Sequence, residues 1–119
     1  MNSMNRKHKH GRVLKSYQSA YPDPLVLSRG DELRLIRADP EWPGWLFCQD
    51  SSGRQGWVPL SYLHGDDILT LTRDYDATEL TVSEDERFEL LENESGWYRV
   101  RISDGKIGWI PQECAELEE

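Results

Sequence analysis

The sequence predicts an all-β fold of two tandem, five-stranded antiparallel barrels behind a disordered basic tail. The first observation is an internal repeat: GRQGWVPLSYL at 53–63 returns as GKIGWIPQECA at 105–115, an offset of 52. The second is a period-two alternation of apolar residues, which half-buried strands require. The third is size, because a unit of about 50 residues is near the lower limit for a single hydrophobic core. Each repeat should therefore be one compact, simple domain.

The repeat extends upstream through two changes of offset. Gly44-Trp45 returns as Gly96-Trp97 at the offset of 52, while the segment from Leu25 matches the segment from Leu80 at 55. Tyr17 matches Tyr75 at 58. The first repeat thus carries three extra residues in each of two connections, and insertions of this kind belong in surface loops. We predict a tail at 1–11, a first domain at 12–64 and a second at 65–119.

Alternating apolar pairs mark the strands within each repeat. Turn residues separate these pairs: Gly30-Asp31 and Asp85-Glu86 follow the first pair, and SSG and SDG predict tight hairpins. No segment shows a helical repeat of useful length. The pairs are Leu25 and Leu27, Leu33 and Leu35, Leu46 and Cys48, Leu80 and Val82, Phe88 and Leu90, and Tyr98 and Val100.

Charge is unevenly divided along the sequence, whose net charge is −8. The tail carries three basic residues, and residues 12–64 balance six basic against six acidic residues. From residue 65 onward there are five basic and sixteen acidic residues. We expect the second domain to repel nucleic acid and anionic membranes and to attract basic segments.

Several functional classes find no support in the sequence. No stretch reaches the ~18 apolar residues of a membrane span, and the N-terminus has no apolar signal-peptide core. Two cysteines at non-equivalent positions make no disulfide framework, which favours a cytoplasmic setting. Outside the tail His64 is the only histidine, and no phosphate-binding loop or zinc cluster is present. We therefore expect no enzyme activity, cofactor or metal.

The order of these landmarks resembles the Src homology 3 (SH3) domain family. Gly30-Asp31, Trp45 and Pro59-Leu60-Ser61-Tyr62 match the family's Gly-Asp, tryptophan and Pro-x-x-Tyr positions. The resemblance covers both repeats, and it implies sixteen core positions, all apolar in this sequence. They are Val13, Leu25, Leu27, Leu33, Leu35, Cys48, Val58, Leu63, Leu71, Leu80, Val82, Phe88, Leu90, Val100, Ile110 and Ala115.

The resemblance also implies a peptide site on each domain. Such domains hold an extended proline-containing ligand in grooves between aromatic rings, and a carboxylate pairs with a basic ligand residue. Lys15 and Arg73 replace the family's first tyrosine, and Cys114 replaces its last. The implied peptide-binding residues are Tyr17, Asp23, Trp45, Pro59 and Tyr62 in the first repeat, and Tyr75, Glu79, Trp97 and Pro111 in the second.

The favoured hypothesis is a non-catalytic adaptor that binds proline-containing or basic peptide segments. Because the first repeat keeps more aromatic residues, we expect Trp45 to mark the stronger site and Trp97 a weaker, charge-dependent one. The main alternative is a structural or inhibitory protein whose acidic second domain docks a basic partner without recognising proline. A bacterial-type cell-wall-binding barrel ranks lower, because no export signal is present. The partner, the host and the oligomeric state are open at this point.

Overall fold

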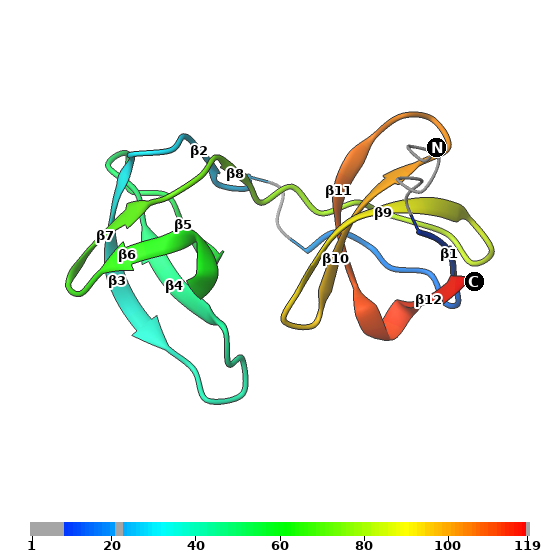
Figure 1. Ribbon diagram of the computed structural model, residues 1–119, viewed down its shortest axis with the longest axis horizontal. Helices are drawn as coiled ribbons and strands as arrows, with labels where there is room; N and C mark the ends of the chain where they lie inside the picture. Colours follow the sequence, from blue (N-terminus) through cyan, green and yellow to red (C-terminus); the bar gives the residue numbers. More distant parts are fainter. Residues whose placement is uncertain (1–8, 21–22, 119) are drawn as a thin grey trace, which may run out of the picture. The chain divides into compact units, whose positions relative to one another are not determined.

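The computed structural model describes residues 9–20 and 23–118, and among these it contains twelve β-strands, two 3-10 turns and no α-helix (Figure 1). The all-β prediction is confirmed. The strands are β1 (His10–Val13), β2 (Val26–Leu27), β3 (Glu32–Ala38), β4 (Trp45–Gln49), β5 (Gln55–Pro59), β6 (Leu63–Gly65), β7 (Ile68–Leu71), β8 (Tyr75–Asp76), β9 (Arg87–Glu94), β10 (Trp97–Ile102), β11 (Ile107–Pro111) and β12 (Ala115–Glu118). The 3-10 turns are Leu60–Tyr62 and Gln112–Cys114.

The strands form two compact units that do not coincide with the two repeats. Unit 1 consists of the described parts of 1–20 and 79–119, and unit 2 of the described part of 21–78. In unit 1 the sheet order is β11-β10-β9-β1-β12. In unit 2 it is β5-β4-β3-β7-β6, with β2 and β8 as a separate pair. Each five-stranded sheet therefore contains the first strand of the other repeat.

The junction between the repeats explains this exchange. β6 and β7 form a hairpin in which Leu63 pairs with Leu71 and Gly65 with Leu69, so that only Asp66 and Asp67 lie between the two strands. Gly65 has a φ of 122°, a backbone conformation that favours glycine. A connection this short turns β7 straight back along β6, where it also pairs with β3. β7 thereby completes the sheet of the first repeat.

β1 occupies the corresponding place in the other sheet. It pairs antiparallel with β9 and with β12, and Figure 1 shows the dark blue β1 beside the red β12. The structure therefore departs from the contiguous domains 12–64 and 65–119, because the first strands change places. Along the chain, the segment that forms unit 2 lies between the two segments that form unit 1. The predicted tail, 1–11, is also too long: β1 begins at His10, and residues 1–8 lie outside the described residues.

The turns and irregularities match between the two repeats. Gly53 and Gly105 have φ values of 94° and 93° in the two predicted hairpins, which are confirmed. The register shifts once between β3 and β4, beside Arg37, and once between β9 and β10, beside Arg99. Equivalent bulges at equivalent places show that both repeats encode the same sheet geometry. Among the described residues, the strand pairing closes neither sheet into a complete ring.

Each unit buries apolar side chains from both repeats. Of the sixteen predicted core positions twelve are buried, and Leu35, Leu63, Leu90 and Ala115 are half-buried. Full burial of an aliphatic side chain contributes about 1.5–3 kcal/mol, so the exchanged Val13 and Leu71 are substantial parts of their cores. The buried core of unit 1 is Val13, Leu80, Val82, Phe88, Val100, Ile102 and Ile110.

We expect a fragment of residues 21–78 to fold by itself, because it contains every strand of unit 2. A matched fragment of residues 21–64 lacks β7 and leaves the edges of β3 and β6 unpaired, so it should be unfolded. Amide chemical-shift dispersion in 15N–1H spectra distinguishes the two states. A folded 21–64 fragment, or an unfolded 21–78 fragment, would contradict the division into exchanged units.

Cys48 lies fully inside unit 2, and burial raises the pKa of its thiol from 9.0 to about 11. The unfolded chain ionises this thiol near pH 9 while the folded chain keeps it neutral, so its contribution to stability is lost as pH rises from 9 toward 11. Between pH 8 and 10.5 the wild-type protein should lose on the order of 1–2 kcal/mol more unfolding free energy than Cys48→Ala. Urea unfolding of both proteins at both pH values measures the difference, and parallel losses would contradict it.

Candidate peptide-binding grooves

The strand exchange sorts the predicted site residues into two mixed sets. Tyr17 follows β1 into unit 1, and Tyr75 lies in β8 of unit 2. By sequence Tyr17 belongs with the first repeat and Tyr75 with the second, whereas in the structure each tyrosine lies in the unit that contains most of the other repeat, because both follow the exchanged first strands. Unit 1 holds Tyr17, Glu79, Trp97 and Pro111, and unit 2 holds Asp23, Trp45, Pro59, Tyr62 and Tyr75.

In unit 1 an aromatic pair forms between residues of different repeats. The rings of Tyr17 and Trp97 lie 6.1 Å apart at an interplanar angle of 80°, an edge-to-face arrangement. The Tyr17 hydroxyl donates a hydrogen bond of 2.6 Å to Oε1 of Glu79, and the backbone N–H of Ala20 donates to the same oxygen at 3.1 Å. The Tyr17 backbone exchanges two 2.9 Å hydrogen bonds with Val82. These contacts fix the ring and the carboxylate beside each other.

The strand ends of unit 1 complete this groove. Trp97 begins β10 directly after Gly96, whose φ is 97°, and it pairs with Pro111 at the end of β11. Cys114 follows in the 3-10 turn and is buried, and burial raises the pKa of its thiol. The thiol therefore belongs to the interior and supplies no ring surface. The groove of unit 1 consists of two rings, a proline and a carboxylate.

Unit 2 contains a second interrepeat pair. The rings of Tyr62 and Tyr75 lie 5.3 Å apart at 84°, and the Tyr75 hydroxyl donates a 3.0 Å hydrogen bond to the carbonyl oxygen of Trp57. Trp45 and Pro59 pair across β4 and β5, as Trp97 and Pro111 do in unit 1. The exchange thus gives unit 2 three groove rings, one of them from the second repeat.

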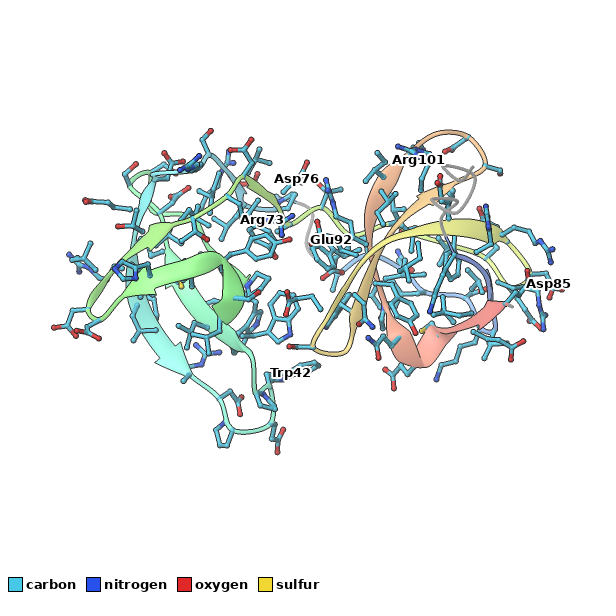
Figure 2. The ribbon with its side chains drawn as sticks, in the orientation of Figure 1. Trp42, Arg73, Asp76, Asp85, Glu92 and Arg101 are labelled. Atoms are coloured by element: carbon cyan, nitrogen blue, oxygen red, sulfur yellow. The ribbon has the colours of Figure 1, made fainter. Side chains whose placement is uncertain are left out.

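Arg73 has a role that the sequence alone did not indicate. Its guanidinium lies 4.3 Å from the centroid of the Tyr62 ring, within cation–π range (Figure 2 labels Arg73). Sequence comparison identifies Arg73 only as the loss of a groove tyrosine. The one available signal was that both repeats carry a basic residue at this position, Lys15 in the first and Arg73 in the second.

The two grooves differ in the exposure of their rings. Trp45, Tyr75 and Tyr62 are only 7%, 5% and 2% exposed, while the prolines do not distinguish the units, because Pro59 and Pro111 are both buried. Tyr17 and Trp97 are half-buried, so part of each ring faces solvent. Outside the predicted set, Trp42 is exposed at 45% in the loop between β3 and β4, where Figure 2 labels it. Accessible groove rings are therefore found in unit 1.

Strand exchange also redistributes the acidic charge. Among the described residues unit 1 has seven basic and eleven acidic side chains, and unit 2 has five basic and ten acidic ones. The first strand of the first repeat brings basic residues to unit 1, while Asp66, Asp67, Asp74 and Asp76 belong to unit 2. Asp23 pairs with Arg54 at 3.5 Å. The expected concentration of acidic charge in one domain is not present in the described residues.

Other kinds of site find little in the described structure. Within residues 9–20 and 23–118 no group of three or more His, Cys, Asp or Glu side chains is placed to hold a metal ion. The same residues contain no helix that is both long and apolar enough to cross a membrane. Trp109 is buried, whereas Trp57 is half-buried, with the guanidinium of Arg37 5.5 Å from the centroid of its ring.

We expect Tyr17→Phe to destabilise unit 1, although Tyr17 belongs to the first repeat. Loss of the hydrogen bond to Glu79 should cost about 1 kcal/mol. Tyr75→Phe is the matched variant, which loses the bond to Trp57 in unit 2. Hydrogen exchange of backbone amides should show reduced protection in β9–β11 for Tyr17→Phe and in β3–β5 for Tyr75→Phe. The reverse pattern would mean that each tyrosine stays with its own repeat.

Comparison with known families matches both repeats. Residues 10–64 match the variant SH3 domain and residues 72–112 match the SH3 domain. The second match begins immediately after β7, the strand that pairs within unit 2. Domains of this family are protein–protein interaction modules that typically bind proline-rich peptides. The chain belongs to the Src homology 3 family and carries two such domains in tandem.

Proposed function

We propose that this protein is a non-catalytic adaptor that binds an extended, proline-containing segment of another protein through unit 1. The observation that carries this proposal is the Tyr17–Trp97 pair, whose rings are held at right angles and partly exposed beside Glu79. Partly exposed aromatic rings offer flat apolar faces against which the proline rings of a ligand can pack. A polyproline II segment is already extended, so it loses little conformational entropy on binding.

Glu79 gives this groove a preference for a positively charged ligand residue. Its Oε1 already accepts hydrogen bonds from Tyr17 and Ala20, which fixes the carboxylate at the edge of the aromatic pair. A carboxylate held in this way attracts an Arg or Lys side chain of the ligand and sets the direction in which the segment binds. The expected ligand therefore combines proline with a basic residue.

Ring exposure reverses the order of the two sites that the sequence suggested. Trp45 lies in the unit with three groove rings, but at 7% exposure it offers little surface to a peptide. Trp97 pairs with Tyr17 and keeps accessible ring surface. Binding energy at such sites comes from aromatic side chains that a ligand can cover. We therefore assign first contact to Trp97.

The alternative of purely electrostatic docking loses its main support. It depended on acidic charge concentrated in the second domain, and the exchanged strands divide that charge almost evenly between the units. Both units remain net acidic, which agrees with a basic ligand and disfavours nucleic acid as a partner. Ionic strength separates the hypotheses, because charge-driven docking weakens steeply with salt and an aromatic groove does not.

We expect Trp97→Ala to weaken binding of proline-containing segments by about 10-fold or more. An aromatic side chain that the ligand covers on binding dominates the affinity of such interfaces. Trp45→Ala is the matched control at the equivalent position of the first repeat, and it should change affinity much less. Titration of a library of proline-rich peptides with and without Arg or Lys, followed by 15N–1H spectra, gives affinities and identifies the responding indole signals.

Three results would contradict this assignment. Response of the Trp45 indole alone would place the site in unit 2. Affinity that falls steeply between low and high salt, with no effect of Trp97→Ala, would favour electrostatic docking. Absence of binding to every peptide in the library, with the folded state confirmed by the spectra, would remove the proposed function.

A further inference from the structure

The two exchanged strands differ in side-chain size at one central position. Gly11 of β1 and Leu69 of β7 are equivalent in the repeat, at an offset of 58. In unit 1 Gly11 pairs with Phe88 on one side and Leu117 on the other. In unit 2 Leu69 pairs with Leu33 and Gly65. Three paired residues therefore lie side by side across each sheet. In unit 1 the central residue of the three is the small one, Gly11, whereas in unit 2 the small residue, Gly65, lies at one end.

The row in unit 1 has no space for a larger residue at position 11. A Cβ atom built on Gly11 would lie 2.7 Å from Cε1 of Phe88 and 2.6 Å from the carbonyl oxygen of Glu116, and it would overlap Cζ of the same ring. Phe88 is buried, so its ring cannot simply swing into solvent. A first strand fits this sheet only if it carries glycine here.

In contiguous pairing, each first strand would join the sheet of its own repeat, and the side chains at this position would not fit. Leu69 would face Phe88 and Leu117 in the sheet of the second repeat, where the space is already filled. Gly11 would face Leu33 and Gly65, where the buried Leu69 side chain now packs, and it would leave a void. Overpacking and cavities both destabilise a core. Side-chain volume therefore favours the exchanged strands.

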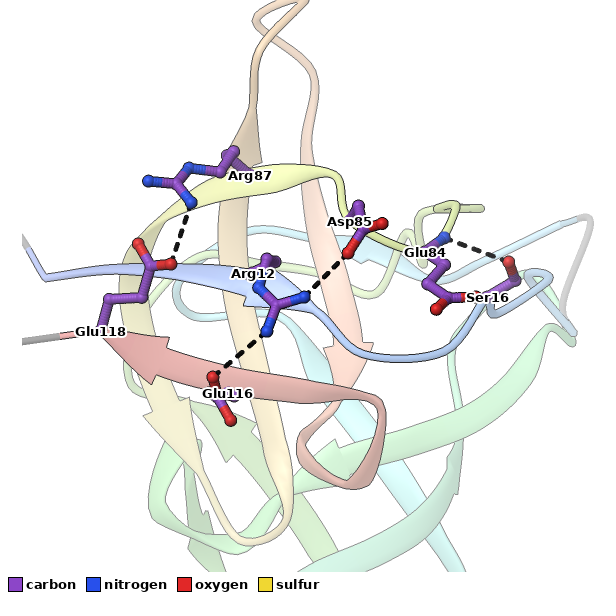
Figure 3. A network of polar contacts seen from close by, with 7 residues as sticks. All are labelled: Arg12, Ser16, Glu84, Asp85, Arg87, Glu116 and Glu118. Atoms are coloured by element: carbon purple, nitrogen blue, oxygen red, sulfur yellow. Dashed lines mark hydrogen bonds and ion pairs between the residues drawn. The ribbon is translucent and has the colours of Figure 1, made fainter.

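Arg12, the next residue of β1, makes ion pairs with carboxylates of the second repeat. Arg12 donates a hydrogen bond of 2.8 Å to Asp85, and its second nitrogen lies 3.5 Å from Glu116 (Figure 3). The equivalent residue of β7 is Thr70, which carries no charge to pair with them. The first repeat has Gly30 and His64 at the positions of Asp85 and Glu116, so Arg12 would lose both of these partners there and would lie opposite Glu32, which pairs with Thr70.

Backbone conformation supports the importance of Asp85. Its φ is 75°, in the left-handed region, and its equivalent Gly30 has a φ of 92°. Glycine adopts this conformation without strain, whereas a residue with a Cβ does so at some cost. The second repeat therefore keeps a carboxylate at a position that suits glycine, and that carboxylate contacts the strand from the other repeat.

Arg73, two residues after the end of β7, also makes a contact that depends on the exchange. Arg73 lies over the Tyr62 ring in unit 2, and the second repeat has Cys114 at the position of Tyr62. In contiguous pairing Arg73 would face a thiol instead of an aromatic ring. The ring contact, like the volume and charge contacts, is available only in the exchanged form.

We propose that Gly11, Arg12, Leu69 and Arg73 are specificity-determining residues that select which sheet each first strand joins. Through this selection they decide that Tyr17 reaches Trp97 and that Tyr75 reaches Tyr62. The proposal concerns strand choice and stands whether or not either groove binds a proline-containing peptide.

A double-mutant cycle in the full chain tests the volume contact. Gly11→Ala alone should lower the melting temperature by roughly 10 °C or prevent folding of unit 1, as overpacking of a small domain does. The part of this loss that comes from the Phe88 ring should disappear in a Phe88→Ala background, while the part from the carbonyl oxygen of Glu116 should stay. Leu33→Ala is the matched control, because Leu33 is equivalent to Phe88 but lies in unit 2, and it should not relieve Gly11→Ala. Equal losses in all three backgrounds would overturn the proposal.

A second variant exchanges the selecting residues between the strands: Gly11→Leu, Arg12→Thr, Leu69→Gly and Thr70→Arg in one chain. Backbone NOEs should then connect residue 69 to Phe88 and Leu117, and residue 11 to Leu33 and Gly65, in a substantial fraction of molecules. Wild-type NOEs with an unchanged melting temperature would overturn the proposal. If this chain does not fold, the coupling between positions 11 and 88 decides the question.

Discussion

The two-residue connection between β6 and β7 is the constraint on which the rest of the structure depends. In each sheet of this protein the last strand of a repeat lies antiparallel to a first strand. A connection through Asp66 and Asp67 alone favours a direct turn back, which places β7 in the first-strand position beside β6. β1 is then excluded from that position and completes the other sheet, between β9 and β12.

Exchange of strands has consequences for function, because each first strand carries a groove tyrosine a few residues behind it. Tyr17 and Tyr75 therefore pack against residues of the opposite repeat, Trp97 and Tyr62. Neither repeat contains a complete set of groove residues, and each unit draws on both. The loss of a ring at Cys114 leaves unit 1 with two rings and a carboxylate, which is the accessible groove.

The two units differ in the continuity of their chain segments. Unit 2 is an unbroken segment, whereas unit 1 is assembled from two segments that flank it in sequence. β1 reaches the sheet of unit 1 from the far side of unit 2 in the chain, so the size and charge of its residues must suit β9 and β12. Gly11 and Arg12 meet this requirement through Phe88, Asp85 and Glu116. Steric fit and chain topology thus favour the same pairing.

Local structure follows from the amino-acid sequence, because apolar alternation and turn residues act over short distances along the chain. It identified the hairpins at Gly53 and Gly105, the buried alternation in β3 and β9, and the family to which both repeats belong. It also identified the residue types that form the grooves. These features depend on neighbours within a few positions and are the same in either pairing of the first strands.

The sheet that each first strand joins depends on contacts between residues far apart in the sequence. Val13 and Leu71 are both apolar residues in similar short strands, so their local pattern fits either sheet. The choice depends on residues distant in sequence, such as Phe88 for Gly11, and on the geometry of a two-residue turn. Groove composition, ring exposure and the distribution of charge between units all follow from that choice. These three features cannot be predicted from local sequence patterns, because the two possible pairings of the first strands share the same local patterns. They differ only in contacts between residues far apart in the chain.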